Sequence, residues 1–210
     1  MDKQLLSLLN EKRQAAYADS DSILKKYDDF LESNGIYHSL NRDVFEKSIK
    51  RRIELCDGIV KLYNEAKLDN ERLALLEDLS IIGYDEDKLT QLAINAFYIE
   101  PRPTDLWEYA DLLYSMKNYR YLPQYLDIIK DKSYGEERQM LILLVGKSKN
   151  DKVIPILTEL LNDSTVYGHA LDALSNFQRD EIDGIMSKYE NCQVCWIREI
   201  AKKYLSSCRH

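Results

Sequence analysis

Glycine and proline are scarce in this sequence: the 210 residues include 7 glycines and 4 prolines. An all-β fold depends on short strands joined by frequent turns, where both residue types are common. Helix-favouring leucine, lysine and glutamate are abundant instead, and hydrophobic residues make up 45% of the chain. That is enough material for a core that needs no metal or disulfide staple. The composition therefore predicts an all-α protein.

The sequence also lacks a long apolar run. No stretch approaches the roughly 18 residues needed to span a bilayer. The apolar part of the opening segment, MDKQLLSLLNEKRQ, is too short for a signal peptide. The four cysteines are scattered, unlike the dense disulfide framework of a small secreted protein. We therefore expect a cytoplasmic protein with reduced thiols and no membrane partner.

Positive charge is in deficit. The 36 acidic and 29 basic residues give a formal net charge of -7, which repels a phosphate backbone unless the basic residues gather on one face. The one notable basic cluster alternates with acidic residues, as on a solvated helix face with ion pairs between turns. It consists of Arg42, Lys47, Lys50, Arg51, Arg52 and Lys61, with Glu46, Glu54 and Asp57 between them. Nucleic acid is thus a disfavoured partner.

Signatures of catalysis are missing as well. The sequence has no glycine-rich phosphate loop, no H-E-x-x-H and no G-x-S-x-G. None of the three histidines, His38, His169 and His210, has a nucleophile partner that the sequence predicts. Carboxylates are so numerous that their proximity along the chain carries no weight. We expect no enzymatic activity, no cofactor and no small-molecule ligand.

What the sequence does contain is helical periodicity, which begins in an N-terminal segment over residues 1–68. A capping sequence at residues 19–22 starts a helix that stops at residues 33–35, and a long helix runs from Asp43 to about Leu68. The apolar faces of these two helices are formed by Ile23, Tyr27, Phe30 and Leu31, and by Phe45, Ile49, Ile53, Cys56, Val60 and Tyr63.

Two shorter helices follow and end at a proline-rich boundary. The first is closed by Gly83, and the second is capped by Asp85. Their apolar positions are Leu76, Leu79 and Ile82, and Leu89, Leu92, Ala93, Ala96 and Phe97. The segment 100–104, which contains two prolines, must interrupt any helix. We place a soft internal boundary there.

From Thr104 onward the pattern repeats itself about every 30 residues. Pro123 and Pro155 each stand near a helix start, where the missing N–H group does no harm. The apolar positions of these helices align as Tyr121, Tyr125 and Ile128; Val153, Leu157 and Leu160; and Ile182, Met186 and Tyr189. The preceding helices align through Leu141, Leu144, Val145 and Gly146, through Ala170, Ala173, Leu174 and Ser175, and through Ile197, Ala201, Tyr204 and Leu205. Paired helices with this period, and small residues where neighbours approach closely, predict a helical solenoid.

This pattern resembles the HEAT-repeat family, in particular its short bacterial version with V-R-x-x-A-x-x-A-L-G on the first helix of each pair. The match is degenerate, because Gln139 and Met140 replace small residues and Gly168 interrupts one first helix. It covers residues 104–205 well and residues 70–100 loosely. The resemblance implies a right-handed superhelical solenoid over residues 69–210, on which the segment 1–68 packs. It also implies a concave binding surface lined by the second helices.

Candidate binding residues come from aromatic crowding and from the solvent-facing side of the second helices, which would line the concave surface. Eight aromatic residues cluster near the proline boundary: Phe97, Tyr98, Trp107, Tyr109, Tyr114, Tyr119, Tyr121 and Tyr125. Half of them fall on predicted core stripes, and we expect packing to account for most of the eight, with two or three exposed as a patch of the kind that favours binding. With the apolar stripes buried, Asp127, Glu159 and Asp183 point outward. The binding candidates are therefore Tyr98, Trp107, Tyr125, Asp127, Glu159 and Asp183, on a mildly acidic ridge suited to a basic protein.

The C-terminal cysteines offer two interpretations. Cys192, Cys195, Cys208 and His210 match the ligand count of a tetrahedral zinc site. However, Cys195 is expected to begin the last helix, and Cys208 aligns with the apolar Phe177. We therefore favour small reduced thiols over a metal site. A thioredoxin-like role is not favoured, since no βαβ pattern surrounds the C-x-x-C motif.

Three functions compete for a helical chain of this kind. The leading hypothesis is a binding scaffold for another protein, with an immunity protein that neutralises a basic toxin as one version by analogy of fold. The alternative is a DNA-binding or base-excision glycosylase of the HEAT-like class, which Trp107 with Asp105 or Asp111, or Trp196 with Arg198, would serve. The acidic balance opposes that alternative. A lyase acting on a tetrapyrrole-protein linkage also resembles this repeat family, but no residue selects a tetrapyrrole.

Overall fold

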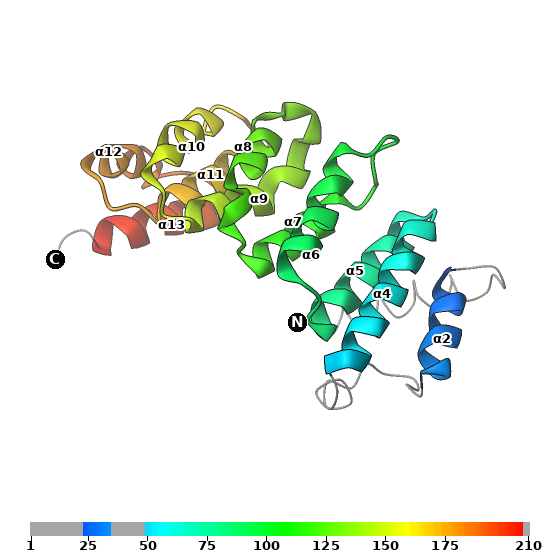
Figure 1. Cartoon of the computed structure of the whole chain (residues 1–210). Helices are drawn as coiled ribbons and strands as arrows, with labels where there is room; N and C mark the ends of the chain where they lie inside the picture. Colours follow the sequence, from blue (N-terminus) through cyan, green and yellow to red (C-terminus); the bar gives the residue numbers. More distant parts are fainter. Residues whose placement is uncertain (1–22, 35–48, 208–210) are drawn as a thin grey trace. The chain divides into compact units, whose positions relative to one another are not determined.

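The computed structural model describes residues 23–34 and 49–207, and this part of the chain is all-helical (Figure 1). The chain divides into two compact units, Met1–Leu92 and Ala93–His210, and each is described by itself. The sequence predicts a boundary after residue 68 instead. The two differ because the helix that begins at Asp69 packs along the helix that ends at Glu65. None of the described helices is long and apolar enough to cross a membrane.

The first unit is built on the helices α2 (Ile23–Ser33), α4 (Ile49–Glu65) and α5 (Asp69–Ile82). Helix α4 packs on both α2 and α5. The carboxylate of the buried Glu71 accepts a hydrogen bond of 3.0 Å from the backbone N–H of Ile23, which ties the start of α2 to α5. Near the C-terminal end of α2, the ring of Phe30 lies where a Cβ on Gly58 would be, so α4 approaches α2 closely at this glycine.

Several predicted helix ends in this unit are confirmed. Asn34 and Ser33 donate side-chain hydrogen bonds to the carbonyl of Phe30 at the end of α2. Gly83 ends α5 in the left-handed region, with φ of 79°. The backbone N–H of Lys88 donates to the carboxylate of Asp85 at 2.9 Å, which caps α6 (Glu86–Asn95). The capping sequence at residues 19–22 and the start of the long helix at residues 43–48 lie outside the described residues.

The second unit contains two sets of helices. We call α7 (Leu106–Met116), α9 (Gln139–Lys147), α11 (Tyr167–Leu174) and α13 (Cys195–Ser207) the first helices. We call α8 (Leu122–Lys130), α10 (Ile154–Leu160) and α12 (Asp180–Tyr189) the second helices. Short 3-10 helices are η1 (Ala96–Tyr98), η2 (Tyr119–Tyr121), η3 (Lys132–Arg138) and η4 (Asp151–Val153). The residues 99–105 around the two prolines are not helical, as predicted.

The packing in this unit runs in series. Each first helix packs on the next, in the order α7, α9, α11 and α13, and each second helix packs on the first helix that follows it. The predicted apolar stripes are the core: Ile128, Leu141, Val153 and Leu157 are among the residues with at most 1% of their surface exposed. The exceptions are Tyr121, Ser175, Tyr189 and Leu205, each of which is half-buried.

Small residues permit the close contacts between first helices. A Cβ built on Gly146 of α9 would lie 2.6 Å from both the Cα and the Cβ of Ala173 on α11, so the two backbones meet there as predicted. Gly168 does not interrupt its helix, contrary to the prediction. It lies within α11. A Cβ built on Gly168 would be 2.2 Å from the ring of Trp196 on α13, so the glycine makes room for this ring.

Candidate binding surface

The second helices α8 and α10 are placed by the same sequence of turns, repeated after 32 residues. Helices α7 and α9 are each followed by a lysine in the left-handed region, Lys117 with φ of 56° and Lys149 with φ of 53°. The side-chain oxygen of the next residue, Asn118 or Asn150, accepts a hydrogen bond from the backbone N–H two residues on. A 3-10 turn and a proline in the first turn then begin each second helix. Equivalent residues of α8 and α10 therefore occupy equivalent places.

The turns that leave these two helices repeat as well. The carboxylate of Asp131 accepts hydrogen bonds from the backbone N–H and the hydroxyl of Ser133, at 2.9 and 2.6 Å. The carboxylate of Asp163 accepts the same pair from Thr165, at 3.1 and 2.7 Å. The pKa of Asp131 is lowered by its hydrogen bonds from Ser133. The two aspartates thus close the same turn in successive helix pairs.

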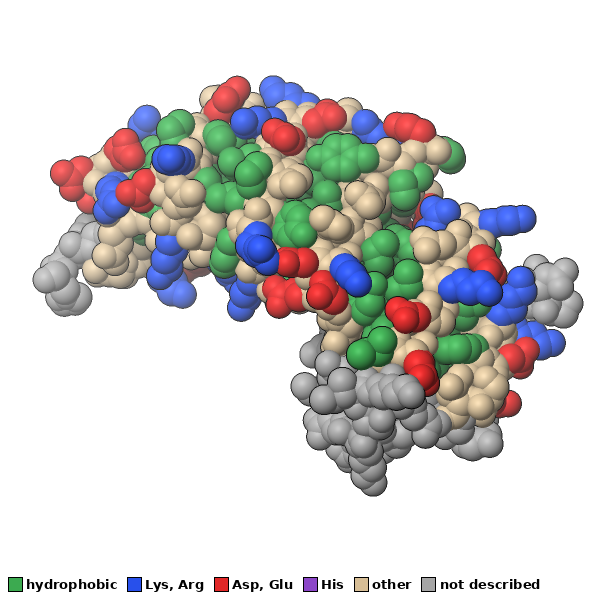
Figure 2. All heavy atoms as spheres, in the orientation of Figure 1, with side chains coloured by type: hydrophobic (Ala, Val, Ile, Leu, Met, Phe, Trp, Pro, Cys, Tyr) green, Lys and Arg blue, Asp and Glu red, His purple; other side chains and the backbone are tan. Residues whose placement is uncertain are grey.

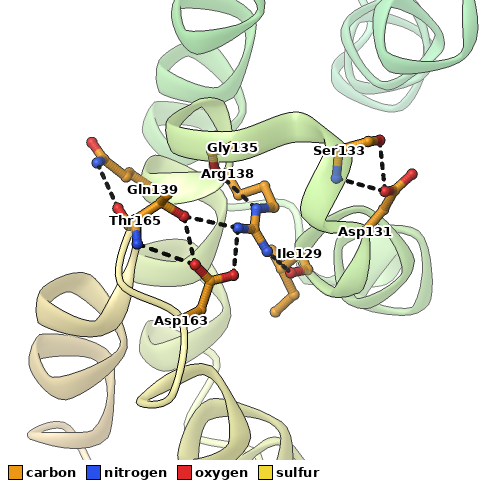
Figure 3. Close-up of polar contacts among 8 residues, drawn as sticks. All are labelled: Ile129, Asp131, Ser133, Gly135, Arg138, Gln139, Asp163 and Thr165. Atoms are coloured by element: carbon orange, nitrogen blue, oxygen red, sulfur yellow. Dashed lines mark hydrogen bonds and ion pairs between the residues drawn. The ribbon is translucent and has the colours of Figure 1, made fainter.

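Arg138 joins the two turns from inside the protein (Figure 3). Its guanidinium donates to the carbonyls of Gly135 and Ile129, both at 2.9 Å, and to the carboxylate of Asp163 at 2.8 Å. A further bond of 3.2 Å reaches the hydroxyl of Thr165. No part of the Arg138 side chain is exposed, and the Asp163 side chain is 10% exposed. This network fixes the end of α8, the turn η3 and the end of α10 relative to one another.

The electrostatics of this network favour the ionised carboxylate. Burial by itself raises the pKa of Asp163. The hydrogen bonds from Arg138 and Thr165, with the charge of Arg138, outweigh that effect and lower the pKa to about 2. The ion pair is therefore present throughout the neutral range and serves the structure of the turns.

On this framework, Asp127 of α8 and Glu159 of α10 are both exposed and stand 32 residues apart, as predicted. Apolar residues lie beside them on the same helices: Pro123 and Pro155 are exposed, and Leu126 and Ile156 are half-buried. Figure 2 shows hydrophobic side chains over α8 and α10 with charged ones around them. The outer face of these two helices is a mixed apolar and acidic surface, which we call the α8–α10 surface.

Tyr98 belongs to the same neighbourhood. It ends η1 and is 56% exposed. Its pKa is raised, first by partial burial and then by the negative charge of Asp127 and by Tyr134. Tyr98 and Asp127, 29 positions apart in sequence, therefore lie near enough for the charge of the carboxylate to affect the pKa of the Tyr98 hydroxyl.

Three predicted binding residues do not belong to this surface: Trp107, which lies on α7, Tyr125 and Asp183. Tyr125 is fully buried, and its hydroxyl donates a hydrogen bond of 3.1 Å to the carbonyl of Asn118, so its prediction as a surface residue is wrong. Asp183 is half-buried and accepts a hydrogen bond of 2.9 Å from the hydroxyl of Tyr204. The position on α12 that corresponds to Glu159 is held by the exposed Lys188. The acidic ridge therefore ends at α10.

The aromatic residues divide much as the sequence predicted. Tyr98, Trp107 and Tyr119 are exposed by 56%, 44% and 37%. Phe97, Tyr109 and Tyr125 are buried, and Tyr114 and Tyr121 are half-buried. The Nζ of Lys147 lies 4.1 Å from the centroid of the Tyr114 ring, where the two can form a cation–π contact. Trp107 is on the first helix α7 and not on a second helix, so its binding role stays a separate prediction.

The residues named for a glycosylase lie on or beside two first helices, α7 and α13. Trp107 and Asp111 lie one turn apart on α7, and partial burial raises the pKa of Asp111. Arg198 donates to the carbonyls of Cys192 and Gln193, at 2.8 and 3.4 Å. Its guanidinium is thereby used to hold the turn before α13. The basic residues Arg42 and Lys47, and the side chains of residues 50–52, lie outside the described part.

The remaining candidates concern metal ligands and histidine. Cys192 is half-buried and Cys195, which begins α13 as predicted, is exposed. Cys208 and His210 lie outside the described residues, among which no group of three metal-ligating side chains occurs. His169 is half-buried with its ring 5.5 Å from that of Trp196, and burial lowers its pKa. His38 also falls outside the described ranges.

Comparison with known proteins gives no match to a family model, to a curated protein or to a solved structure.

Sequence reasoning missed the residues that define the repeat most sharply. The pair Lys-Asn at 117–118 recurs at 149–150, directly before the aligned helices, and marks the same left-handed residue and asparagine turn. Asp131 and Asp163 recur with the same spacing, each two residues before a serine or threonine. Both signals are identical polar residues that recur 32 positions apart in the sequence. A search for apolar periodicity overlooks them because it considers only the apolar positions.

Proposed function

We propose that this protein is a non-enzymatic scaffold of the HEAT-like solenoid type that binds another protein in the cytoplasm through the α8–α10 surface. One repeated arrangement supports this proposal. Each of the successive second helices α8 and α10 carries an exposed acidic residue, Asp127 or Glu159, together with an exposed proline and a half-buried aliphatic side chain. Apolar area supplies affinity for a partner, and the flanking carboxylates supply orientation and selectivity.

The serial packing of the first helices supports the solenoid part of the proposal. Each first helix contacts its neighbours in the series, and the turns between α7 and α10 repeat residue by residue. In a solenoid such stacking sets second helices side by side along one wall, and a right-handed stack makes that wall concave. The second helices are then available to a guest while the first helices form the core seam.

The chemistry of the surface favours a basic partner. Asp127 and Glu159 are exposed, and Tyr98 adds an exposed aromatic ring within electrostatic range of Asp127. Tyrosine rings bury a large area at small entropic cost, and carboxylates at the rim pair with lysine or arginine of a partner. A basic protein, including a toxin that an immunity protein would neutralise, fits this combination.

The test is co-purification of the tagged chain from its native host, followed by mass spectrometry. We expect one stoichiometric protein with the unmodified chain, and at least about tenfold weaker retention, or ~1.4 kcal/mol, with Asp127→Lys and Glu159→Lys combined. A matched control makes the same change of charge elsewhere, at the exposed Glu136 and Glu199. Equal loss in both variants, or the absence of a stoichiometric partner, would contradict the proposal.

A further inference from the structure

The motif Cys192-Gln193-Val194-Cys195 forms the connection between α12 and α13, and the proposed binding function does not use it. The chain bends at Gln193 and Val194, so the two cysteines stand at either end of the bend. Cys195 is exposed as the first residue of α13, and Cys192 is half-buried; both thiols are free. The protein thus presents two reduced thiols at one surface turn.

The bend is held in place from α13. Nη1 of Arg198 donates to the carbonyls of Cys192 and Gln193, at 2.8 and 3.4 Å. The backbone N–H of Arg198 donates to the carbonyl of Val194 at 3.1 Å, and the N–H of Cys192 donates to the carbonyl of Tyr189 at 3.0 Å. The backbone on both sides of the bend is therefore anchored to regular helix, which restricts the separation of the two cysteines.

Residues three apart across a tight turn have Cα atoms within about 7 Å of each other. A disulfide spans Cα separations of about 4.4–6.8 Å. A fixed bend that brings its ends within this range keeps two thiols at high effective concentration and limits the backbone movement that closure requires. Closure of the ring then competes with reaction of either thiol with a second molecule.

We propose that Cys192 and Cys195 are a reversible dithiol–disulfide site that reacts with low-molecular-weight disulfides such as glutathione disulfide. The thiolate of the exposed Cys195 attacks one sulfur of the small disulfide, which forms a mixed disulfide and releases one thiolate. The thiolate of Cys192 then attacks the Sγ of Cys195 and expels the second small thiol. The cysteine pair loses two electrons and two protons, and one small disulfide becomes two thiols.

Tryptic mass spectrometry tests this site directly, because cleavage after Lys188 and after Arg198 leaves both cysteines in one peptide and places Cys56 and Cys208 in others. The full-length protein is equilibrated with mixtures of reduced and oxidised glutathione, free thiols are alkylated after denaturation, and the digest is kept unreduced. We expect peptide 189–198 to appear without alkyl groups and two hydrogens lighter than its dithiol form. The buried Cys56 serves as the internal control and is expected to be fully alkylated.

Single variants separate the two steps. Cys192→Ser is expected to retain a stable glutathione adduct on Cys195, because the thiol that resolves it is gone. Cys195→Ser is expected to acquire its adduct more slowly, since Cys192 is half-buried. Arg198→Lys keeps the charge and the cleavage site but cannot hold the two carbonyls as a planar guanidinium does. It is expected to lower the disulfide-to-dithiol ratio by roughly fivefold at a fixed glutathione ratio.

Three results would overturn the proposal. The first is a peptide 189–198 that stays a dithiol in excess glutathione disulfide. The second is a glutathione adduct that persists on the unmodified protein, which would mean that Cys192 does not reach Cys195. The third is a cross-linked pair of peptides in which Cys208 is bonded to Cys192 or Cys195.

Discussion

Arg138 carries a permanent positive charge into a position where none of its side chain is exposed. Its stability there depends on the carboxylate of Asp163 and on three oxygen acceptors from nearby turns. Replacement by methionine keeps the apolar stem and removes every donor. We expect Arg138→Met to lower the free energy of unfolding by about 3–5 kcal/mol, the usual cost of breaking a buried ion pair. Urea unfolding followed by tryptophan fluorescence measures this, since both tryptophans belong to the second unit.

A second ion pair of the same unit is the control. Arg179 and Asp151 approach to 2.5 Å, but their side chains are 54% and 57% exposed. Solvent screens such a pair, so Arg179→Met is expected to lower the free energy of unfolding far less than Arg138→Met does. Equal effects of the two methionine variants would show that burial does not decide the contribution of Arg138.

The lowered pKa of Asp163 predicts how stability responds to acid. A carboxyl group with a pKa of about 2 in the folded chain and about 3.8 when unfolded stabilises the folded state above the higher value. That contribution, about 1–2 kcal/mol after allowance for solvent screening, is lost as the pH falls from about 4 to about 2. We expect the Asp163→Asn variant to show a weaker fall in unfolding free energy over this range than the unmodified protein. Parallel curves for the two proteins would contradict the assignment.

At the residue level, the sequence predicted apolar positions well and polar ones poorly. Leu141, Val153 and Leu157 are buried because helical periodicity alone puts them on the inner face. Tyr125 was expected both in the core and at the surface. It can be buried because its hydroxyl donates a hydrogen bond to the carbonyl of Asn118. The burial of Arg138 could not be foreseen, because its acceptors come from turns up to 27 residues away.

The contact between α9 and α11 depends on a residue without a side chain. A Cβ on Gly146 would stand 2.6 Å from the Cα of Ala173, which is backbone and cannot move aside cheaply. We expect Gly146→Ala to force the two helices apart and to lower the free energy of unfolding by about 1–3 kcal/mol, despite the better helix propensity of alanine. Thermal or urea unfolding of the purified variant gives the value.

Gly184 in α12 is the matched control, because nothing lies within 4 Å of a Cβ placed there. Alanine at this position gains helix propensity without a clash, so Gly184→Ala is expected to stabilise the protein by about 0.5–1 kcal/mol. A destabilising Gly184→Ala, or a neutral Gly146→Ala, would be inconsistent with the close contact of α9 and α11.

The two left-handed lysines that follow α7 and α9 offer a further test of the turns. A side chain at φ of 56° or 53° brings Cβ close to the backbone and costs roughly 1 kcal/mol. Glycine is free of that cost but adds entropy to the unfolded chain. We therefore expect Lys117→Gly and Lys149→Gly each to raise the unfolding free energy by up to about 1 kcal/mol, and by similar amounts. A marked loss of stability in either variant would show that its lysine side chain has a structural role.

At the level of elements, helix stops were predictable where a single residue enforces them, as Gly83 and the prolines near residue 100 do. The short 3-10 turns before α8 and α10 were not predicted. Their hydrogen bonds depend on an asparagine side chain and on a left-handed lysine. Lysine has no marked preference for the left-handed conformation, so only the recurrence of the Lys-Asn pair in the sequence indicates this turn.

Net charge is a property of the whole molecule, and it separates protein partners from nucleic acid. With a formal charge of -7, the chain repels phosphates at long range. We expect no binding to duplex DNA even at low salt, measured by fluorescence anisotropy of a labelled duplex. Salt-dependent binding that weakens as ionic strength rises would instead favour the glycosylase alternative.

The division into two units also belongs to this scale. The sequence placed a boundary after residue 68, where the apolar pattern of the long helix ends, but the compact units divide at Leu92 and Ala93. Glu71 explains part of the difference, since its carboxylate holds the first residue of α2 to α5. A bond over 48 positions of sequence leaves no periodic signal, so pattern reasoning cannot assign α5 to the earlier helices.

The 32-residue register of the second unit makes its length adjustable. Lys117 and Lys149 begin equivalent turns, and the block 118–149 contains one complete set of the turns, the second helix and the first helix that repeat. Inserting a second copy of this block after Lys149 would again place an asparagine turn directly after a left-handed lysine, as at both existing junctions. The second unit would then contain one more pair of helices, and a molecule bound along the second helices would contact a longer surface.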